Sequence, residues 1–155
     1  MLRRLLSTMI IGFGAVSCGG GDDDGADPAP GGSGSAACGG RGQAYAPGLS
    51  QSGAHVEVAL VEALPAPPEL FDNRWIIRVT DAAGAPVTNA AVGAAAFMPD
   101  HAHGSTKTPV IAALEDGRYD ISPLHFMMPG LWEIDITVQA PEGPDQVTFA
   151  FCVEG

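Results

Sequence analysis

Two stretches near the C-terminus alternate apolar and polar residues, and this alternation restricts the fold more than any other feature of the chain. The stretches are LWEIDITVQA at 131–140 and QVTFAFCV at 146–153. Each has four large apolar residues at every second position: Trp132, Ile134, Ile136 and Val138 in the first, and Val147, Phe149, Phe151 and Val153 in the second. Successive side chains of a β-strand point to opposite faces, so each stretch predicts a strand with one buried face.

Three earlier stretches support the same class of structure. Residues 54–63, 73–80 and 89–97 form short apolar runs, and turn-forming sequences follow at 81–86, 115–118, 128–130 and 141–145. The run at 89–97 is rich in alanine, which also favours helices; we interpret it as a strand whose small side chains allow close approach. Short strands at this spacing predict an all-β protein, an immunoglobulin-like β-sandwich of about seven strands.

The N-terminus has the pattern of an export signal. Arg3 and Arg4 precede a short apolar run at 5–16, which is too short to cross a bilayer as a helix. The run ends in AVSC, which resembles the lipobox of bacterial lipoproteins. This resemblance implies a signal peptide at 1–17 and a mature chain that is held to a lipid bilayer through an acylated Cys18. The alternative is an ordinary secreted protein with a chance cysteine.

The segment after this cysteine differs in composition from the rest. Residues 18–43 are rich in glycine, aspartate and proline and contain no large apolar side chain after Cys18. Such a segment buries too little surface to offset the entropy of ordering it, so we predict a disordered, flexible tether and interpret its DDD run as a solvated spacer. Gly19 after the cysteine suggests sorting to the outer membrane. Residues 44–155 are then one domain of ordinary size.

The charge of the chain limits its partners. The whole sequence has a formal net charge of −11, and removal of residues 1–17 leaves five basic residues against eighteen acidic ones, a net charge of about −13. Such a chain is repelled by phosphate backbones, so we expect no nucleic-acid partner. The same negative field raises the local concentration of cations.

Three cysteines are present, and lipidation of Cys18 leaves two. Cys38 lies near the end of the tether, and Cys152 lies in the last predicted strand on the face away from the core. In an oxidising compartment we predict a disulfide between them. The alternatives are two free thiols, or one of these thiols as a copper ligand.

Soft and borderline metal ligands cluster in one loop. The sequence FMPDHAHGSTKTP at 97–109 contains Met98, His101 and His103, and LHFMMPG at 124–130 adds His125 and Met128. Thioether sulfur suits Cu(I), and imidazole serves both copper oxidation states, so the first loop is a candidate copper site with His125 or Met128 as a less certain fourth ligand. The alternative is an exposed turn that holds two histidines by chance. Zinc gains little from a thioether, and a closed structural zinc site is not indicated.

Several of these motifs follow one another in a recognisable order. A tryptophan in an early strand, the turn at 81–87, the MPDHAH loop at 98–103, EDGRYDI at 115–121 and MPGLWE at 128–133 together resemble the YtkA-like family, which is grouped with the FixH family of bacterial envelope proteins. The resemblance implies an immunoglobulin-like domain associated with copper handling or with assembly of copper-containing oxidases. It also implies that Met98, His101, His103 and Met128 correspond to the family's Met and His positions. FixH proteins have a transmembrane helix, which is absent here.

These observations favour an envelope lipoprotein with a copper-binding domain and, as a possible partner, a copper-receiving protein. The alternative is a metal-free binding or structural module tethered to a membrane. No nucleophile motif, zinc-protease helix motif or carboxylate pair is evident, so we do not expect an enzyme. Metal analysis of the purified domain would separate the first two classes.

Overall fold

The computed structural model describes residues 38–155, so the predicted signal peptide, Cys18 and most of the predicted tether lie outside the described residues. The described part forms nine strands. In chain order these are β1 (Leu49–Ser52), β2 (Val56–Leu64), β3 (Phe71–Asp81), β4 (Ala91–Met98), β5 (His103–Gly104), β6 (Val110–Ala113), β7 (Arg118–Phe126), β8 (Gly130–Ala140) and β9 (Gly143–Val153). None of residues 38–155 belongs to a helix long and apolar enough to cross a membrane.

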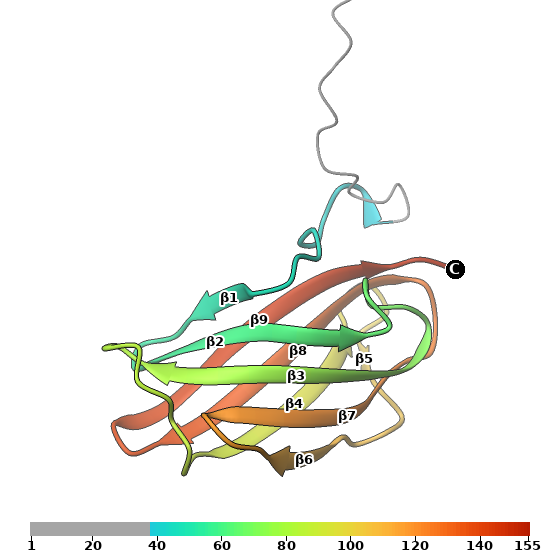
Figure 1. Cartoon of the computed structure of the whole chain (residues 1–155). Coiled ribbons are helices and arrows are strands. Elements are labelled where there is room, and N and C mark those ends of the chain that lie inside the picture. The colour runs from blue at the N-terminus through green and yellow to red at the C-terminus, as the bar shows by residue number, and fades with distance from the viewer. Residues whose placement is uncertain (1–37) are drawn as a thin grey trace, which may run out of the picture.

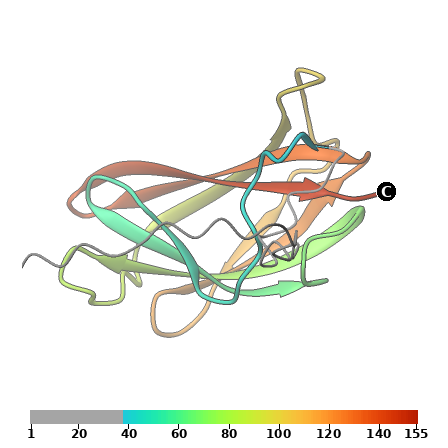
Figure 2. The same ribbon diagram turned by 90° about the horizontal axis from the view of Figure 1, so that it is seen from above.

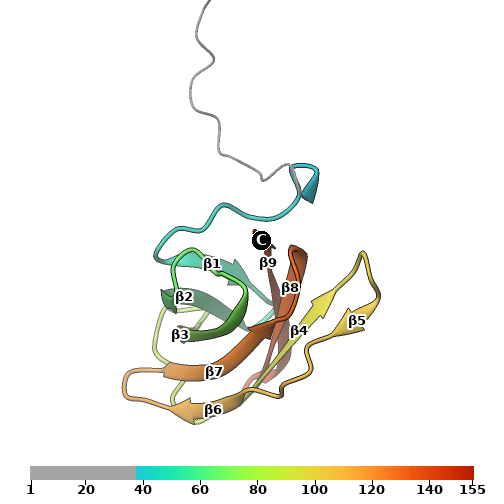
Figure 3. The ribbon, with the colours of Figure 1, turned by 90° about the vertical axis from the view of Figure 1, so that its right-hand side faces the viewer.

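The strands form two sheets that pack face to face (Figures 1 and 3). One sheet has the order β1-β2-β3-β7-β6 and the other β5-β4-β8-β9, and the neighbouring strands pair antiparallel. The predicted all-β sandwich is therefore confirmed. The nine strands exceed the expected seven because β1, β5 and β6 are only two to four residues long, too short for an alternating pattern.

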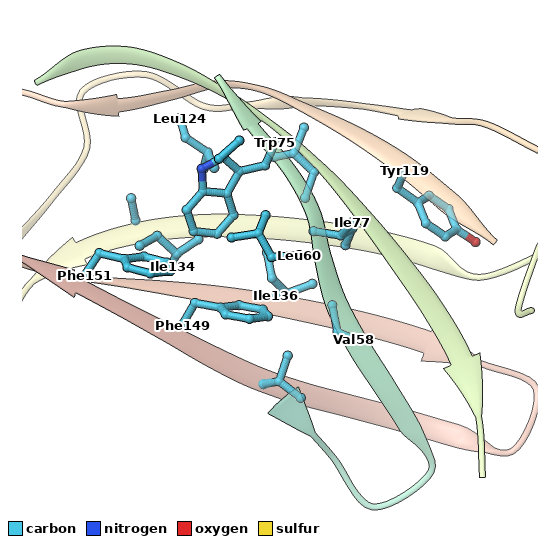
Figure 4. Close-up of a cluster of buried hydrophobic side chains, with 14 of the residues drawn as sticks. Val58, Leu60, Trp75, Ile77, Tyr119, Leu124, Ile134, Ile136, Phe149 and Phe151 are labelled. Atoms are coloured by element: carbon cyan, nitrogen blue, oxygen red, sulfur yellow. The ribbon is translucent and has the colours of Figure 1, made fainter. Parts of the chain in front are cut away.

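The core between the sheets consists of the predicted inward faces. Each of the eight large apolar residues of β8 and β9 that define the alternation is at most 6% exposed. Trp75 of β3 packs edge-on against Phe149 and Phe151 of β9, with ring centroids 5.9 and 5.6 Å apart (Figure 4). Contacts of this geometry add to the free energy gained from the buried area. They fix how the first sheet sits on the second.

The alanine-rich stretch forms strand β4, as predicted, and pairs with β8 from Ala91 opposite Gln139 to Phe97 opposite Glu133. Its small residues allow the close approach that the sequence suggests. A Cβ atom added at Gly93 would lie 2.7 Å from Oγ1 of Thr137, so a larger residue there would require the Thr137 side chain to move. Met98 is the last residue of this strand.

The segment at 38–43 is fastened to β9. Cys38 and Cys152 form a disulfide with their Cα atoms 5.9 Å apart, which confirms the predicted pairing. Gln43 donates its backbone N–H to the carbonyl of Ala150 at 2.6 Å, and the Ala150 N–H donates to the Gln43 side chain at 3.0 Å. In Figures 1 and 2 this cyan segment lies beside the C-terminal half of β9. The six residues before position 44 therefore pack on the domain.

Candidate metal site

The Met and His loop is the turn between β4 and β5, at the margin of the second sheet (Figure 3). Pro99 ends β4, and two backbone hydrogen bonds close the turn: the His101 N–H donates to the Met98 carbonyl at 3.2 Å, and the Ala102 N–H donates to the Pro99 carbonyl at 3.3 Å. Ala102 has the left-handed φ of 53° that reverses the chain. The turn brings His103 back beside Met98.

Met98 and His103 are directly opposite each other in the β4–β5 pair. Side chains at opposite positions of an antiparallel pair share one face, with Cβ atoms about 5 Å apart. Met98 is 1% exposed and belongs to the core cluster, whereas His103 is half-buried. Thioether and imidazole therefore lie together where the core meets solvent.

The rings of His101 and His103 lie edge to face, with centroids 5.9 Å apart and an interplanar angle of 87°. With metal–nitrogen bonds of about 2.0 Å, two imidazoles on one ion have ring centroids at most about 6.3 Å apart, and this pair lies within that limit. Nδ1 of His103 lies 3.1 Å from the Gly104 carbonyl. A carbonyl only accepts, so in a neutral His103 ring this contact favours the proton on Nδ1 and leaves the lone pair of Nε2 for a metal.

The turn before β8 forms the other wall of the site. The rings of His103 and Trp132 are 5.8 Å apart, and Trp132 Nε1–H donates to the Met128 carbonyl at 2.9 Å. Met128 is half-buried against the core, and the Met98 methyl group occupies the space beside Gly130. The structure therefore places Met128 in the turn next to Met98, His103 and Trp132.

Asp100, at the tip of the loop, is held by a residue that the sequence did not indicate. The Arg41 guanidinium donates to both carboxylate oxygens, Nη1 to Oδ1 at 2.8 Å and Nη2 to Oδ2 at 2.5 Å. The hydrogen bond from Arg41 lowers the pKa of Asp100 from its usual value, and nearby His101 adds to this effect. Arg41 and Asp100 are 59 residues apart, so no local pattern could have linked them.

His125 has a different set of neighbours. Its Nδ1 lies 2.5 Å from Oδ1 of Asp72, and the same carboxylate accepts hydrogen bonds from Lys107 at 2.7 Å. These hydrogen bonds, first that from Lys107 and then that from His125, lower the pKa of Asp72. The next residue, Phe126, points into the core and packs against Trp132, so His125 faces the other side of β7. The structure joins His125 to Asp72 and not to the histidines of the loop.

This turn thus holds one thioether and two imidazoles, and the adjoining turn holds a second thioether. Among residues 38–155 no group of three or more His, Cys, Asp or Glu side chains is arranged to hold a metal ion. The candidate ligand set at this loop therefore combines methionine with histidine. A set of thioether and imidazole ligands suits copper, because sulfur favours Cu(I) and imidazole binds both oxidation states.

Comparison with solved structures places the fold among known proteins. A DUF4426 family protein from Pseudomonas aeruginosa PAO1 is 14% identical, with 68% of this chain and 96% of that chain covered and a TM-score of 0.52. A copper-bound variant of FetP from uropathogenic Escherichia coli strain F11 is 12% identical, with 72% and 97% covered and a TM-score of 0.50. At these identities the similarity concerns the fold. Among curated proteins, none has a significantly similar sequence.

Comparison with protein families is more specific. The YtkA-like family matches residues 50–137, which is more than half of the chain. The matched residues run from β1 into β8 and include the Met and His loop and the turn at 128–130. The chain therefore belongs to the YtkA-like family.

Proposed function

We propose that this protein binds a copper ion through Met98, His101 and His103, with Met128 as the candidate for a fourth ligand. The observation that carries the proposal is the convergence of these side chains: Met98 opposite His103 in the hairpin, and the two imidazoles 5.9 Å apart. His125, a weaker candidate from the sequence, is left out because it pairs with Asp72.

The chemistry of the donors supports this choice of metal. A bound copper ion would be redox-active and could be transferred to a second protein. The residues of this chain would bind the ion and shield it from water. Trp132 and the Met128–Gly130 turn cover the buried side, whereas His101 is exposed and leaves the outer side accessible. FetP, which shares the fold at low identity, has been solved with copper bound.

We place this copper-binding role in the cell envelope, on a lipoprotein anchored through Cys18 and facing the periplasm, most simply at the outer membrane. The support is the export signal, the AVSC junction and the disulfide, which forms in oxidising compartments. We infer that the protein delivers copper to a partner and is not an enzyme, because the sequence has no nucleophile-elbow or zinc-protease motif. Mass spectrometry of the membrane fraction tests the anchor, since an acylated peptide must begin at Cys18.

A pair of substitutions tests the metal site. His101→Ala with His103→Ala should weaken Cu(II) binding by at least about 100-fold, because both imidazoles are lost. Cu(I) binding should fall less, because thioether ligands remain. The matched control is His55→Ala, which removes an exposed histidine just before β2. Competition with a chromophoric chelator, in air for Cu(II) and anaerobically with ascorbate for Cu(I), measures both affinities.

The outcomes separate the two function classes. Loss of binding in the double variant and wild-type binding in the His55 control would support the copper role. If the double variant holds Cu(II) as tightly as the wild type, the histidines of the loop are not the ligands. If the wild type binds neither oxidation state better than about millimolar, the protein is a metal-free binding module.

A further inference from the structure

One carboxylate, that of Asp100, belongs to the loop that carries the candidate ligands but is paired with an arginine outside the loop. Asp100 is the residue before His101, and its side chain is 40% exposed. Both of its oxygens accept hydrogen bonds from Arg41, at 2.8 and 2.5 Å, so this two-point ion pair orients the carboxylate toward Arg41. An aspartate carboxylate is ionised at neutral pH, so Asp100 would be a competent ligand if it were released from Arg41.

Arg41 is itself held in position. Its backbone N–H and its Nε–H both donate to the Cys38 carbonyl, at 3.1 and 3.0 Å. Cys38 is 1% exposed and covalently bound to Cys152 of β9. The next residue, Gly42, has a φ of 95° and lies so close to β9 that a Cβ atom there would be 3.0 Å from the Cys152 backbone nitrogen. The Arg41 guanidinium therefore extends from a fixed turn of the N-terminal segment and reaches Asp100 in the β4–β5 turn.

We propose that Arg41 determines the metal preference of the site by keeping Asp100 out of the ligand set. This inference rests on the proposed copper function and concerns which cations the same loop accepts. With Asp100 engaged, the loop offers thioether and imidazole, which favour a soft ion such as Cu(I). A free carboxylate beside two imidazoles would add a hard, anionic ligand that Zn(II) commonly uses, and Zn(II) would then compete with copper.

The test compares Zn(II) and Cu(I) binding by the full chain and its variants, using chelator competition. Arg41→Gln should raise the affinity for Zn(II) about tenfold, with Cu(I) affinity changed less than about twofold, so that selectivity for Cu(I) falls. Asp100→Asn alone should match the wild type, because Asp100 is not a ligand in the intact protein. The double variant Arg41→Gln/Asp100→Asn should lose the gain in Zn(II) affinity.

Two further variants control for charge and for geometry. Arg74→Gln breaks another arginine–carboxylate pair, with Asp120 in the first sheet, and changes the net charge equally, so it should leave Zn(II) affinity unchanged. Arg41→Lys keeps the charge but loses the fork of two donors, so it should give a smaller rise in Zn(II) affinity. Thermal unfolding of each variant, followed by circular dichroism, verifies that it is folded before metal is added.

The inference is overturned if Arg41→Gln leaves the ratio of Zn(II) to Cu(I) affinity unchanged, or if the double variant keeps the gain. Both results can occur while the wild type still binds Cu(I), and the proposed copper function would then stand. Failure of the wild type to bind Cu(I) would overturn the proposed function and this inference with it.

Discussion

Gly130 shows how a single missing side chain shapes the candidate site. It has a φ of 135°, and a Cβ atom at this position would collide with the terminal methyl group of Met98. The space beside this glycine is therefore what allows the buried thioether to lie against the start of β8. Any larger residue would displace the Met98 side chain from this space.

Gly130→Ala should lower the affinity for Cu(I) about tenfold, because the added methyl group displaces the Met98 sulfur from its place beside His103. The control is Gly48→Ala, which also has a left-handed φ, 79°, but has no neighbouring atom within 4 Å of the added Cβ. The control also places an L residue at a positive φ, but without the collision. Anaerobic chelator competition measures both variants, and equal Cu(I) affinities would show that the position of Met98 does not matter.

Individual elements differ in how well the sequence predicts them. Long strands such as β8 and β9 carry enough alternating positions to fix their buried faces, and the sequence predicts β4 despite its alanine content. Short strands such as β5, with two residues, exist only because a partner strand supplies the hydrogen bonds. Their formation depends on tertiary contacts that no local pattern contains.

The same distinction applies to the candidate site. Met98, His101 and His103 are close in sequence, so the order of residues along the chain is enough to reveal their cluster. Trp132 and Arg41 join them from segments about 30 and 60 residues away, through ring packing and a two-point ion pair. His125 and Met128 are equivalent in sequence as fourth ligands, yet strand alternation turns His125 toward Asp72.

The disulfide is the strongest tie on the N-terminal segment. It joins residues 114 positions apart, and a cross-link over a loop of this size stabilises a fold by about 4 kcal/mol in the chain-entropy model. Cys38→Ser/Cys152→Ser should therefore lower the free energy of unfolding by about this amount. The amide of Gln43, which donates to Ala150, should exchange faster. Urea unfolding and hydrogen exchange test both effects; unchanged stability would show that the hydrogen bonds alone hold the segment.

At the scale of the whole molecule, a carboxylate ties the two sheets together at the end opposite the disulfide. Asp145 of β9 accepts backbone hydrogen bonds from Ala54, His55 and Val56, at 2.9, 2.7 and 3.0 Å. These residues form the turn into β2 and its first position, in the other sheet. The hydrogen bonds favour the ionised carboxylate and lower the pKa of Asp145, the one from His55 most.

The lowered pKa gives the fold a defined sensitivity to acid. Because the unfolded chain binds the proton more readily, with an ordinary aspartate pKa of about 3.9, Asp145 stabilises the fold fully above that pH. The stabilisation is lost as pH falls through the lower folded pKa.

Between about pH 6.5 and pH 3, the urea midpoint should therefore drop further in the wild type than in Asp145→Asn, whose side chain does not titrate. Glu142→Gln, an exposed change in the same hairpin, should drop as far as the wild type. Equal drops in Asp145→Asn and the wild type would mean that other carboxylates govern acid unfolding.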